Sequence, residues 1–312
     1  MYRVSVVIPM YYEEEVVNEC YSRLKKVFME LQEYEYEFIF INDGSRDETL
    51  QLLEEIAKRD ENVKVISFSR NFGHQCAVTA GLKFTTGDAV VIIDADMQDP
   101  PELIIDMIKL WEQGNEVIYA KRKVRKGESC FKLITAKMFY KFLDGLSDIN
   151  IPQDTGDFRL ADRKVIDVIN DLPEHNKFLR GLFSWVGYKQ VPIEYERQSR
   201  FAGKTKYPLK KMIKLAIDGI ISFSNKPLKI LGVIGMFSII ISFGILIYSL
   251  ISYLFKLNNL TAGWTSLMVT ITFFSGIQLL SIWLMSEYIS RIYDESKGRP
   301  QYIIDKTINI DK

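Results

Sequence analysis

A short apolar run that ends in two acidic residues and a proline pair constrains the fold of this chain more than any other feature. Residues 90–93 are valines and isoleucines, Asp94 and Asp96 follow one residue apart, and prolines occupy positions 100–101. A buried strand of this kind brings its last side chains to the carboxyl edge of an α/β sheet, where open sheets bind ligands. The two carboxylates and the amide oxygen of Gln98 suit a hard divalent cation that also takes phosphate oxygens. The run therefore predicts a site for a metal-bound phosphate ester.

The first 120 residues alternate short apolar runs with amphipathic stretches. The expected strands cover residues 4–9, 37–41, 63–68, 89–94 and 117–120. Between the first two strands, residues 16–31 place apolar side chains at helical spacing. Strands that alternate with helices of this size predict a doubly wound, mostly parallel α/β sheet.

Two other strand ends carry polar residues that would reach the same edge. Asp43 ends the second expected strand, and Gly44 permits a tight turn before a helix. A carboxylate at this position suits a nucleobase N–H or a ribose hydroxyl, although capping of the next helix would also explain it. Residues 9–13 end the first strand. Three strand ends therefore line one expected cleft.

A third acidic position follows a loop rich in proline and aspartate. Asp157 lies within residues 156–160 and would join the cleft if this segment returned to the sheet. Arg159 could form a structural ion pair with Asp157. Further along, Arg200 and Lys204 belong to a basic loop that fits a lid over a diphosphate, a grip on a lipid phosphate, or a polybasic membrane tether.

Charge and cysteine usage narrow the function classes. The chain of 312 residues has 40 Lys and Arg against 40 Asp and Glu, so its zero net charge gives no sign of a nucleic-acid partner. Three scattered cysteines without C-x-x-C spacing exclude a disulfide framework and a zinc ribbon, and indicate a reducing, cytosolic compartment. Only His74 and His175 are present, which argues against a histidine-based metal site.

The last third of the chain changes character. Two apolar runs, at about residues 228–255 and 264–286, contain uncharged stretches longer than the roughly 20 residues that cross a bilayer. Basic residues precede the first run and follow the second, whereas the connecting segment holds only Lys256. By the positive-inside rule, both ends of the pair face the cytoplasm. The runs therefore predict a transmembrane hairpin in the cell membrane with both chain termini cytoplasmic.

Two stretches before the first span predict helices at the membrane surface. Residues 131–146 and 208–223 each combine an apolar face with lysines, as interfacial helices on an anionic leaflet do. An ordinary helix packed on the sheet is the alternative for each stretch. The expected organisation is a cytoplasmic α/β domain over residues 1–205, a juxtamembrane helix over 206–227, the two spans within 228–290, and a cytoplasmic tail over 291–312.

Several segments match, in order, those of one known family. They are residues 7–9, 41–45, 70–73, 94–100, 156–160, 184–187 and 203–207, followed by the two apolar runs, which end near 287–289. On these segments the chain resembles the membrane-anchored family 2 glycosyltransferases that load a sugar onto a polyprenyl phosphate, such as bactoprenol glucosyltransferases and dolichol-phosphate mannose synthases. One departure is Tyr12, which precedes Glu13 where the family usually has asparagine.

The resemblance implies a GT-A fold, a nucleotide-diphosphate-sugar donor, and Mg²⁺ or Mn²⁺ as the metal. Its bacterial side implies uridine as the base. The implied metal ligands are Asp94, Asp96 and Gln98. The implied nucleotide-sugar contacts are Pro9, Tyr11, Glu13, Asp43, Asp94, Arg200 and Lys204. The implied acceptor-phosphate contacts are Arg122, Lys132 and Thr135. The implied catalytic residues are Asp157 and Asp96.

The reaction implied by the resemblance is transfer of one glucose, related hexose or N-acetylhexosamine to polyprenyl phosphate. A phosphate monoester carries an ionised oxygen at pH 7, because its second pKa is about 6. It therefore hardly needs a general base, unlike a sugar hydroxyl. We expect Asp157 to orient the acceptor or metal-bound groups, and a single in-line attack to invert the anomeric centre.

Three alternatives differ in what they require. A glycosyltransferase acting on diacylglycerol would need a real base, because its acceptor is a neutral hydroxyl. A processive polysaccharide synthase would need a Gln-x-x-Arg-Trp motif and more spans. A transporter of lipid-linked sugar would need a polar path through the membrane. The sequence is compatible with a homo-oligomer and with a flippase partner but specifies neither of them. It also does not specify which sugar is transferred.

Overall fold

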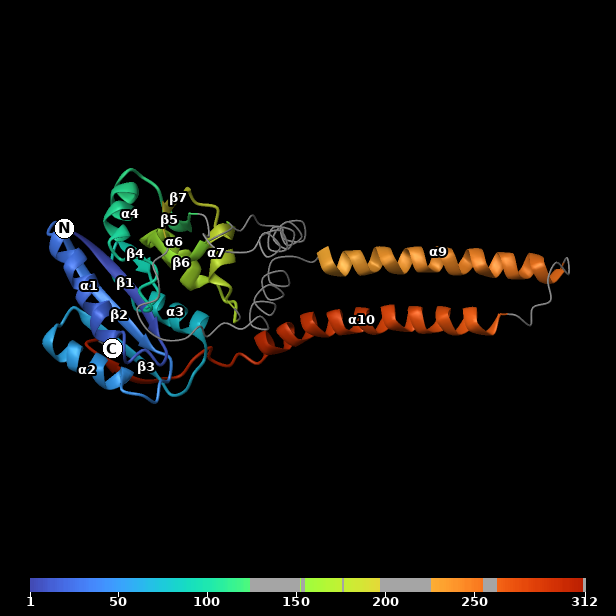
Figure 1. Cartoon of the computed structure of the whole chain (residues 1–312), viewed down its shortest axis with the longest axis horizontal. Helices are drawn as coiled ribbons and strands as arrows, with labels where there is room; N and C mark the ends of the chain where they lie inside the picture. The colour runs from blue at the N-terminus through green and yellow to red at the C-terminus, as the bar shows by residue number, and fades with distance from the viewer. Residues whose placement is uncertain (124–151, 153–154, 176, 197–225, 255–262, 311–312) are drawn as a thin grey trace. The chain divides into compact units, whose positions relative to one another are not determined.

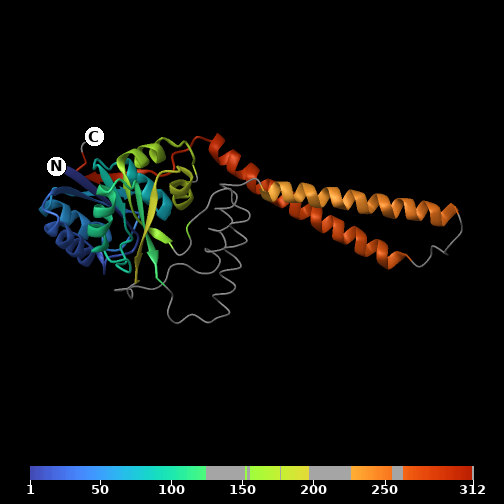
Figure 2. The same ribbon diagram turned by 90° about the horizontal axis from the view of Figure 1, so that it is seen from above.

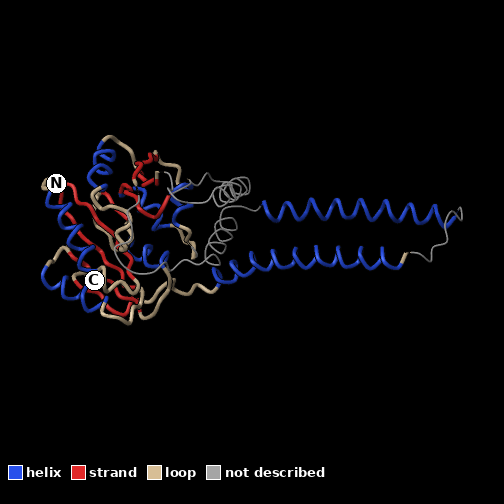
Figure 3. Tube along the Cα trace, viewed as in Figure 1, coloured by secondary structure: helices blue, strands red, loops and turns tan. Residues whose placement is uncertain are grey.

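An eight-stranded mixed sheet forms the frame of the first of two compact units in the chain (Figures 1 and 3). The computed structural model describes residues 1–123, 152, 155–175, 177–196, 226–254 and 263–310. The first unit holds the described residues up to 196 together with 300–310, and the second holds those from 226 to 299. Across the sheet the order is β7 (Gln190–Tyr195), β5 (Val117–Arg122), β6 (Thr155–Asp162), β4 (Ala89–Ile92), β1 (Tyr2–Met10), β2 (Tyr34–Asn42), β3 (Val63–Phe68) and β8 (Ile304–Ile308).

The central strands β4, β1, β2 and β3 run parallel to one another. β6 runs antiparallel to both β4 and β5, β8 runs antiparallel to β3, and β7 is parallel to β5. In this register Val6 of β1 lies between Phe38 of β2 and Val91 of β4. The five strands expected from the sequence all form, and the expected α/β sheet with a parallel centre is confirmed.

Helices cover both faces of the sheet because its central strands are apolar on both sides (Figure 2). The cluster that packs on one face includes apolar residues of α1 (Val17–Glu30), α2 (Thr49–Arg59) and α4 (Leu103–Glu112). The opposite face is contacted by α3 (His74–Lys83) and α6 (Arg163–Asp171), and α7 (Leu179–Trp185) packs beside α6.

Helix α3 lies unusually close to the sheet. A Cβ atom on Gly81 would come within 2.4 Å of Cγ1 of Val7 and 2.8 Å of Cδ1 of Ile41, so only glycine fits there. This close approach fixes α3 against β1 and β2. It therefore also fixes the beginning of the helix, where His74 is the first residue.

The last segment of the chain returns to the sheet as β8. Its pairing with β3 is reinforced by Tyr302, whose ring stacks on Phe68 with centroids 5.0 Å apart. The side-chain amide of Asn309 donates hydrogen bonds to the carbonyl oxygens of Ala57 and Val63. Residues 300–310, which were expected to belong to a separate tail over 291–312, are therefore part of the first unit. The strand has few apolar residues, so its order comes from pairing with a distant strand, which no local pattern reports.

Two long helices, α9 (Lys226–Leu254) and α10 (Trp264–Ser296), form the described part of the second unit. They contact each other, and many of their large apolar side chains are exposed, Phe243 among them. They coincide with the two expected spans. Among the residues that the structure describes, no helix combines the length and the apolar character needed to cross a membrane. The expected interfacial stretches, 131–146 and 208–223, lie outside the described residues.

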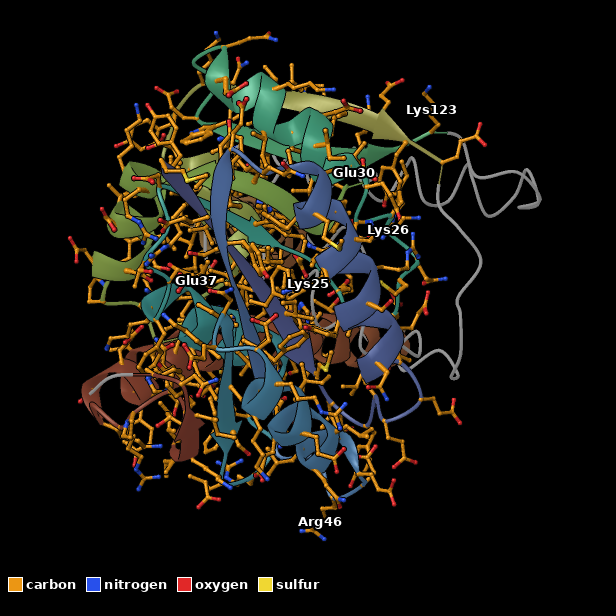
Figure 4. The ribbon with its side chains drawn as sticks, turned by 90° about the vertical axis from the view of Figure 1, so that its left-hand side faces the viewer. Lys25, Lys26, Glu30, Glu37, Arg46 and Lys123 are labelled. Carbon is orange, nitrogen blue, oxygen red and sulfur yellow. The ribbon has the colours of Figure 1, made fainter. Side chains whose placement is uncertain are left out.

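A buried glutamate ties neighbouring strands of the sheet together. Glu37 of β2 is labelled in Figure 4 and is only 3% exposed. Its carboxylate accepts hydrogen bonds from Nζ of Lys64 at 2.6 Å, from the backbone N–H of Thr86 at 2.6 Å, and from the hydroxyl of Ser5. Burial by itself raises the pKa of Glu37, but these three donors outweigh it and hold the pKa below its usual value.

Replacing Glu37 with glutamine should destabilise the fold, because it leaves the Lys64 ammonium without its carboxylate. We expect a loss of about 3 kcal/mol in the free energy of unfolding at pH 7, measured by denaturant titration of the full chain. Because a carboxylate with a depressed pKa stabilises only while it is ionised, the loss should shrink as the pH falls below about 4.3.

Glu35→Gln on the same strand is the matched control. Glu35 pairs with Arg3, and these two side chains are 50% and 46% exposed. Screening by water makes such a pair weak, so this variant should lose less than about 1 kcal/mol. Equal losses in the two variants would contradict the assignment of Glu37 as a buried tie.

Candidate active site

The carboxyl ends of the parallel strands meet at one edge of the sheet. Asp43 directly follows β2, and Asp94 lies two residues beyond the end of β4. The antiparallel pairing of β4 with β6 sets Ile92 opposite Arg159. Continuing this register places Asp94 opposite Asp157. The segment that carries Asp157 therefore does return to the sheet, and the third acidic residue joins the cleft.

Asp157 is held between an arginine and a histidine. Arg180 of α7 donates from Nε to Oδ1 of Asp157 at 2.6 Å and from Nη2 to Oδ2 at 3.2 Å. His74 Nε2 lies 2.9 Å from the same Oδ2. Burial raises the pKa of Asp157, but the charges and hydrogen bonds of Arg180 and His74 hold it well below its usual value. Asp157 is therefore ionised at neutral pH.

His74 is a cation in this arrangement. Burial lowers the pKa of the His74 imidazole, but the hydrogen bond to Asp157 and the charge of Asp94 raise it to about 9. Asp94 faces the pair with Oδ1 at 3.7 Å from Nε2 of His74 and keeps 33% of its side chain exposed. Burial raises the pKa of Asp94 to about 6, with neighbouring carboxylates adding to the effect and His74 opposing it.

One ligand atom each of His74, Asp94 and Asp157 lies within 4.8 Å of the others. An imidazole nitrogen and two carboxylate oxygens form a donor set that fits a divalent metal such as Mn²⁺, provided that His74 gives up its proton, because only the neutral imidazole can bind a metal. The small number of histidines argued against a histidine-containing site. The structure nevertheless places one histidine, at the start of α3, beside carboxylates from β6 and from the loop after β4, so a metal ligand at His74 becomes a proposal.

Asp96 and Gln98, the other expected metal ligands, lie further along the loop after β4. The backbone N–H of Gln98 donates to Oδ1 of Asp96 at 3.2 Å. Asp94, Asp96 and Gln98 are partly exposed, whereas the alternating residues Ala95 and Met97 are buried. The loop therefore keeps the three polar side chains accessible. The close cluster contains only Asp94 of the three, so ligation by Asp96 and Gln98 and the catalytic role of Asp96 stay predictions.

Asp43 holds the loop that leads into α3. Its carboxylate accepts hydrogen bonds from residues 71–73, through two backbone N–H groups at 2.7 and 2.9 Å and a side-chain amide at 2.8 Å. The loop comes so close that a Cβ atom on Gly44 would lie 2.3 Å from the carbonyl carbon of Arg70. The observed contacts of Asp43 are therefore structural, and its contact with a nucleotide stays a prediction.

The other expected nucleotide-sugar contacts follow β1 at the same edge. Pro9 is buried in the strand, and Tyr11 is partly exposed with its ring edge-on to Tyr12. Tyr12 has a φ of 55°, which is uncommon for a bulky side chain. The backbone N–H of Glu13 donates to the hydroxyl of Thr49 at 3.0 Å. The structure brings these residues to the expected edge, and their contacts with a nucleotide stay predictions.

Among the expected acceptor-phosphate residues, only Arg122 lies in the described part of the chain. Its Nε donates to the hydroxyl of Tyr195 at 3.1 Å, and its Nη2 lies 3.9 Å from Oδ1 of Asp99. The other residues expected to bind phosphates lie outside the described residues: Lys132, Thr135, Arg200 and Lys204. Acceptor binding by this set stays a prediction.

The ion-pair partner of Asp157 differs from the one that the sequence suggested. Arg159 does not pair with the Asp157 carboxylate; its Nε and Nη2 donate to the carbonyl oxygens of Asp157 and Gly156 at 3.3 and 3.1 Å. Its guanidinium lies 4.5 Å from the ring centroid of Phe183. Arg180 supplies the pair instead. No spacing rule could find it, because the packing of α7 near β6 brings it to the site.

Comparisons with known proteins identify the family of this chain. The model of the family "Glycosyl transferase family 2" matches residues 5–169. The chain is 53% identical over 308 residues to "Uncharacterized glycosyltransferase YkcC" of Bacillus subtilis, covering 98% of this chain and 94% of that protein. It is 43% identical over 302 residues to the "Bactoprenol glucosyl transferase" of Shigella phage SfV, covering 97% and 98%.

One similar solved structure is that of glucosyl-3-phosphoglycerate synthase from Mycobacterium tuberculosis in complex with Mn²⁺, UDP and phosphoglyceric acid. Its TM-score is 0.49 and its sequence identity is 18%, and the match covers 70% of this chain and 76% of that one. The family match spans most of β1, strands β2 to β6, the acidic loop and Asp157. The chain therefore belongs to glycosyl transferase family 2 and is a glycosyltransferase that resembles bactoprenol glucosyltransferases over nearly its full length.

Proposed function

We propose that this chain is an inverting glycosyltransferase that moves one hexose or N-acetylhexosamine from a nucleotide-diphosphate sugar, UDP-linked, to polyprenyl phosphate. The observation that carries the proposal is the meeting of His74, Asp94 and Asp157 at the carboxyl edge of the sheet. The near-full-length similarity to a bactoprenol glucosyl transferase supports the acceptor.

The acidic end of β4 is the proposed metal site. Asp94 lies among carboxylates that raise its pKa, and His74 and Asp157 offer ligand atoms within 4.8 Å. Asp96 and Gln98 are accessible on the same loop. Mg²⁺ or Mn²⁺ held there would neutralise the negative charge that develops on the leaving nucleoside diphosphate. The protein groups would position the diphosphate so that the anomeric carbon faces the acceptor.

Asp157 is proposed to orient groups in the site. Both of its oxygens already accept from cations, Arg180 at one and His74 with Arg180 at the other. A carboxylate in such a clamp is a weak proton acceptor. This geometry favours an acceptor that is already ionised, which a phosphate monoester is and a diacylglycerol hydroxyl is not.

The second unit is proposed to anchor the enzyme as a transmembrane hairpin in the cell membrane. α9 and α10 coincide with the uncharged runs and expose large apolar side chains. The chain leaves the glycosyltransferase domain before α9 and rejoins it at β8. A chain that leaves a domain, crosses the membrane twice and rejoins the same domain ends on the side from which it started. This connection and the basic residues that flank the two runs support a cytoplasmic position for both termini.

A product assay tests the reaction. The purified full chain would be incubated with Mg²⁺ or Mn²⁺, short-chain polyprenyl phosphate and a panel of nucleotide sugars, with mass spectrometry as the readout. One donor should give a polyprenyl-phosphate sugar, and Asp96→Asn should lower turnover about 100-fold, because it removes charge stabilisation from the leaving group. Asp106→Asn, an exposed carboxylate paired with Lys109 on α4, should keep full turnover. No lipid product from any donor would overturn the proposal.

The role of Asp157 separates a phosphate acceptor from a hydroxyl acceptor. If Asp157 only orients groups, Asp157→Asn should lose less than about 100-fold in turnover with polyprenyl phosphate. Circular dichroism of the same variant would verify that it is folded. A loss near 10⁴-fold in folded protein that binds Mn²⁺ as tightly as the wild type would instead indicate a general base and favour diacylglycerol as the acceptor. A loss of that size is about the largest contribution expected of a general base.

Reporter fusions test the hairpin. Green fluorescent protein fused after Lys312 should fluoresce, because that end is expected in the cytoplasm. Alkaline phosphatase fused to a chain ending at Asn259 should be active, because its disulfides form only outside the cytoplasm. Inactive phosphatase at Asn259, with a stable fusion visible on an immunoblot, would contradict the hairpin.

A further inference from the structure

A small polar pocket adjoins Arg180 and is distinct from the acidic cluster. It is a shallow hollow that is open to solvent. Two arginines, four neutral polar residues and one proline line it, namely Arg159, Arg180, Tyr119, Thr155, Ser184, Gln190 and Pro152. No carboxylate is among the described residues at its wall, so the pocket presents positive charge and hydrogen-bond donors.

Arg159 gives the pocket its charge. The residue is 5% exposed, and burial lowers its pKa to about 10, so it is still a cation at neutral pH. Its guanidinium donates only to the carbonyl oxygens of Gly156 and Asp157 and lies over Phe183. Within the described residues it forms no ion pair with a carboxylate. A buried charge is normally compensated by an opposite one. Among the described residues the nearby charge of Asp157 favours the Arg159 cation without a direct ion pair, so the guanidinium can still attract an anion.

The neighbouring elements place further donors around Arg159. The β5–β6 register sets Tyr119 directly opposite Arg159, which puts the two side chains on one face of the sheet. On α7, Arg180 and Ser184 are four residues apart and share one side of the helix. The Ser184 hydroxyl is 3.3 Å from the Arg180 carbonyl oxygen, a long contact that a better acceptor would replace.

We propose that this pocket binds the phosphate group of the acceptor, with Arg159, Arg180 and Ser184 as its recognition residues. The identity of the ligand rests on the proposed function, whereas the oxyanion chemistry rests on the pocket. Guanidinium forks match phosphate oxygens in geometry and charge. Arg180 also contacts Asp157, so an acceptor phosphate held there adjoins the cluster at which the sugar is transferred.

Binding measurements on the full chain test the pocket without turnover. Isothermal titration would use farnesyl phosphate as the monoester probe and UDP with Mn²⁺ as the donor-side probe. Ser184→Ala should weaken farnesyl phosphate about 5-fold, the value of one net hydrogen bond. Arg159→Lys should weaken it at least about 10-fold, because lysine keeps the charge and loses the fork. UDP affinity should be unchanged in both variants.

Arg3→Lys, the same substitution at an exposed guanidinium, is the control and should change neither affinity. Ser184→Ala removes one hydroxyl from a partly exposed position, so it keeps the test valid if Arg159→Lys does not fold. Weakened UDP binding with unchanged farnesyl phosphate binding would assign the pocket to the donor diphosphate and overturn the proposal. Unchanged binding of both probes would show that it is no phosphate site, which also overturns it.

Kinetics separate this inference from the proposed function. In the product assay, Ser184→Ala should raise the KM for polyprenyl phosphate about 5-fold and leave the KM for the nucleotide sugar unchanged. If the wild type makes no lipid product, the proposed acceptor is wrong. In that case, weaker binding of inorganic phosphate by Ser184→Ala and Arg159→Lys would still support a phosphate site in the pocket. Unchanged binding of inorganic phosphate by both variants would overturn it.

Discussion

The antiparallel pairing of β6 with β4 is the constraint on which the site depends. It sets Asp157 opposite Asp94 at the edge where the parallel strands end. Two carboxylates brought this close repel each other, and the cost is offset by Arg180 and His74, which sit against Asp157 from α7 and α3. The cationic state of the His74 imidazole follows from that arrangement, because the hydrogen bond to Asp157 and the charge of Asp94 raise its pKa.

The site separates charge into two neighbouring zones. In the zone around Asp94, burial and the neighbouring carboxylates raise the pKa of this carboxyl to about 6, and the carboxylates favour a metal. The zone around Arg159 and Arg180 is basic and contains no described carboxylate at its wall. Arg180 belongs to both zones because it contacts Asp157 and also lines the pocket. The proposed reaction would bring a metal-bound diphosphate to an anionic acceptor, and this division would let mostly different groups hold the two anions.

The geometry of the cleft also depends on the end of the chain. Tyr302 stacks on Phe68, and the backbone N–H of Ser69 donates to the carbonyl oxygen of Ile303 at 3.1 Å. The residues that follow Ser69 form the loop that Asp43 holds, and that loop leads directly into His74. The segment after α10 therefore helps to hold in place the loop that leads into α3.

The sequence by itself determined the α/β sheet, the acidic end of the strand before Asp94, and the two long apolar helices, because each is a local pattern of period or composition. It also singled out Asp157, whose place beside Asp94 only the β4–β6 register decided. Tertiary structure alone decided that Arg180 pairs with Asp157, that His74 completes the cluster, and that residues 304–308 form a strand. These contacts join residues far apart in the chain, and their energy comes from burial and charge pairing that no short window of sequence contains.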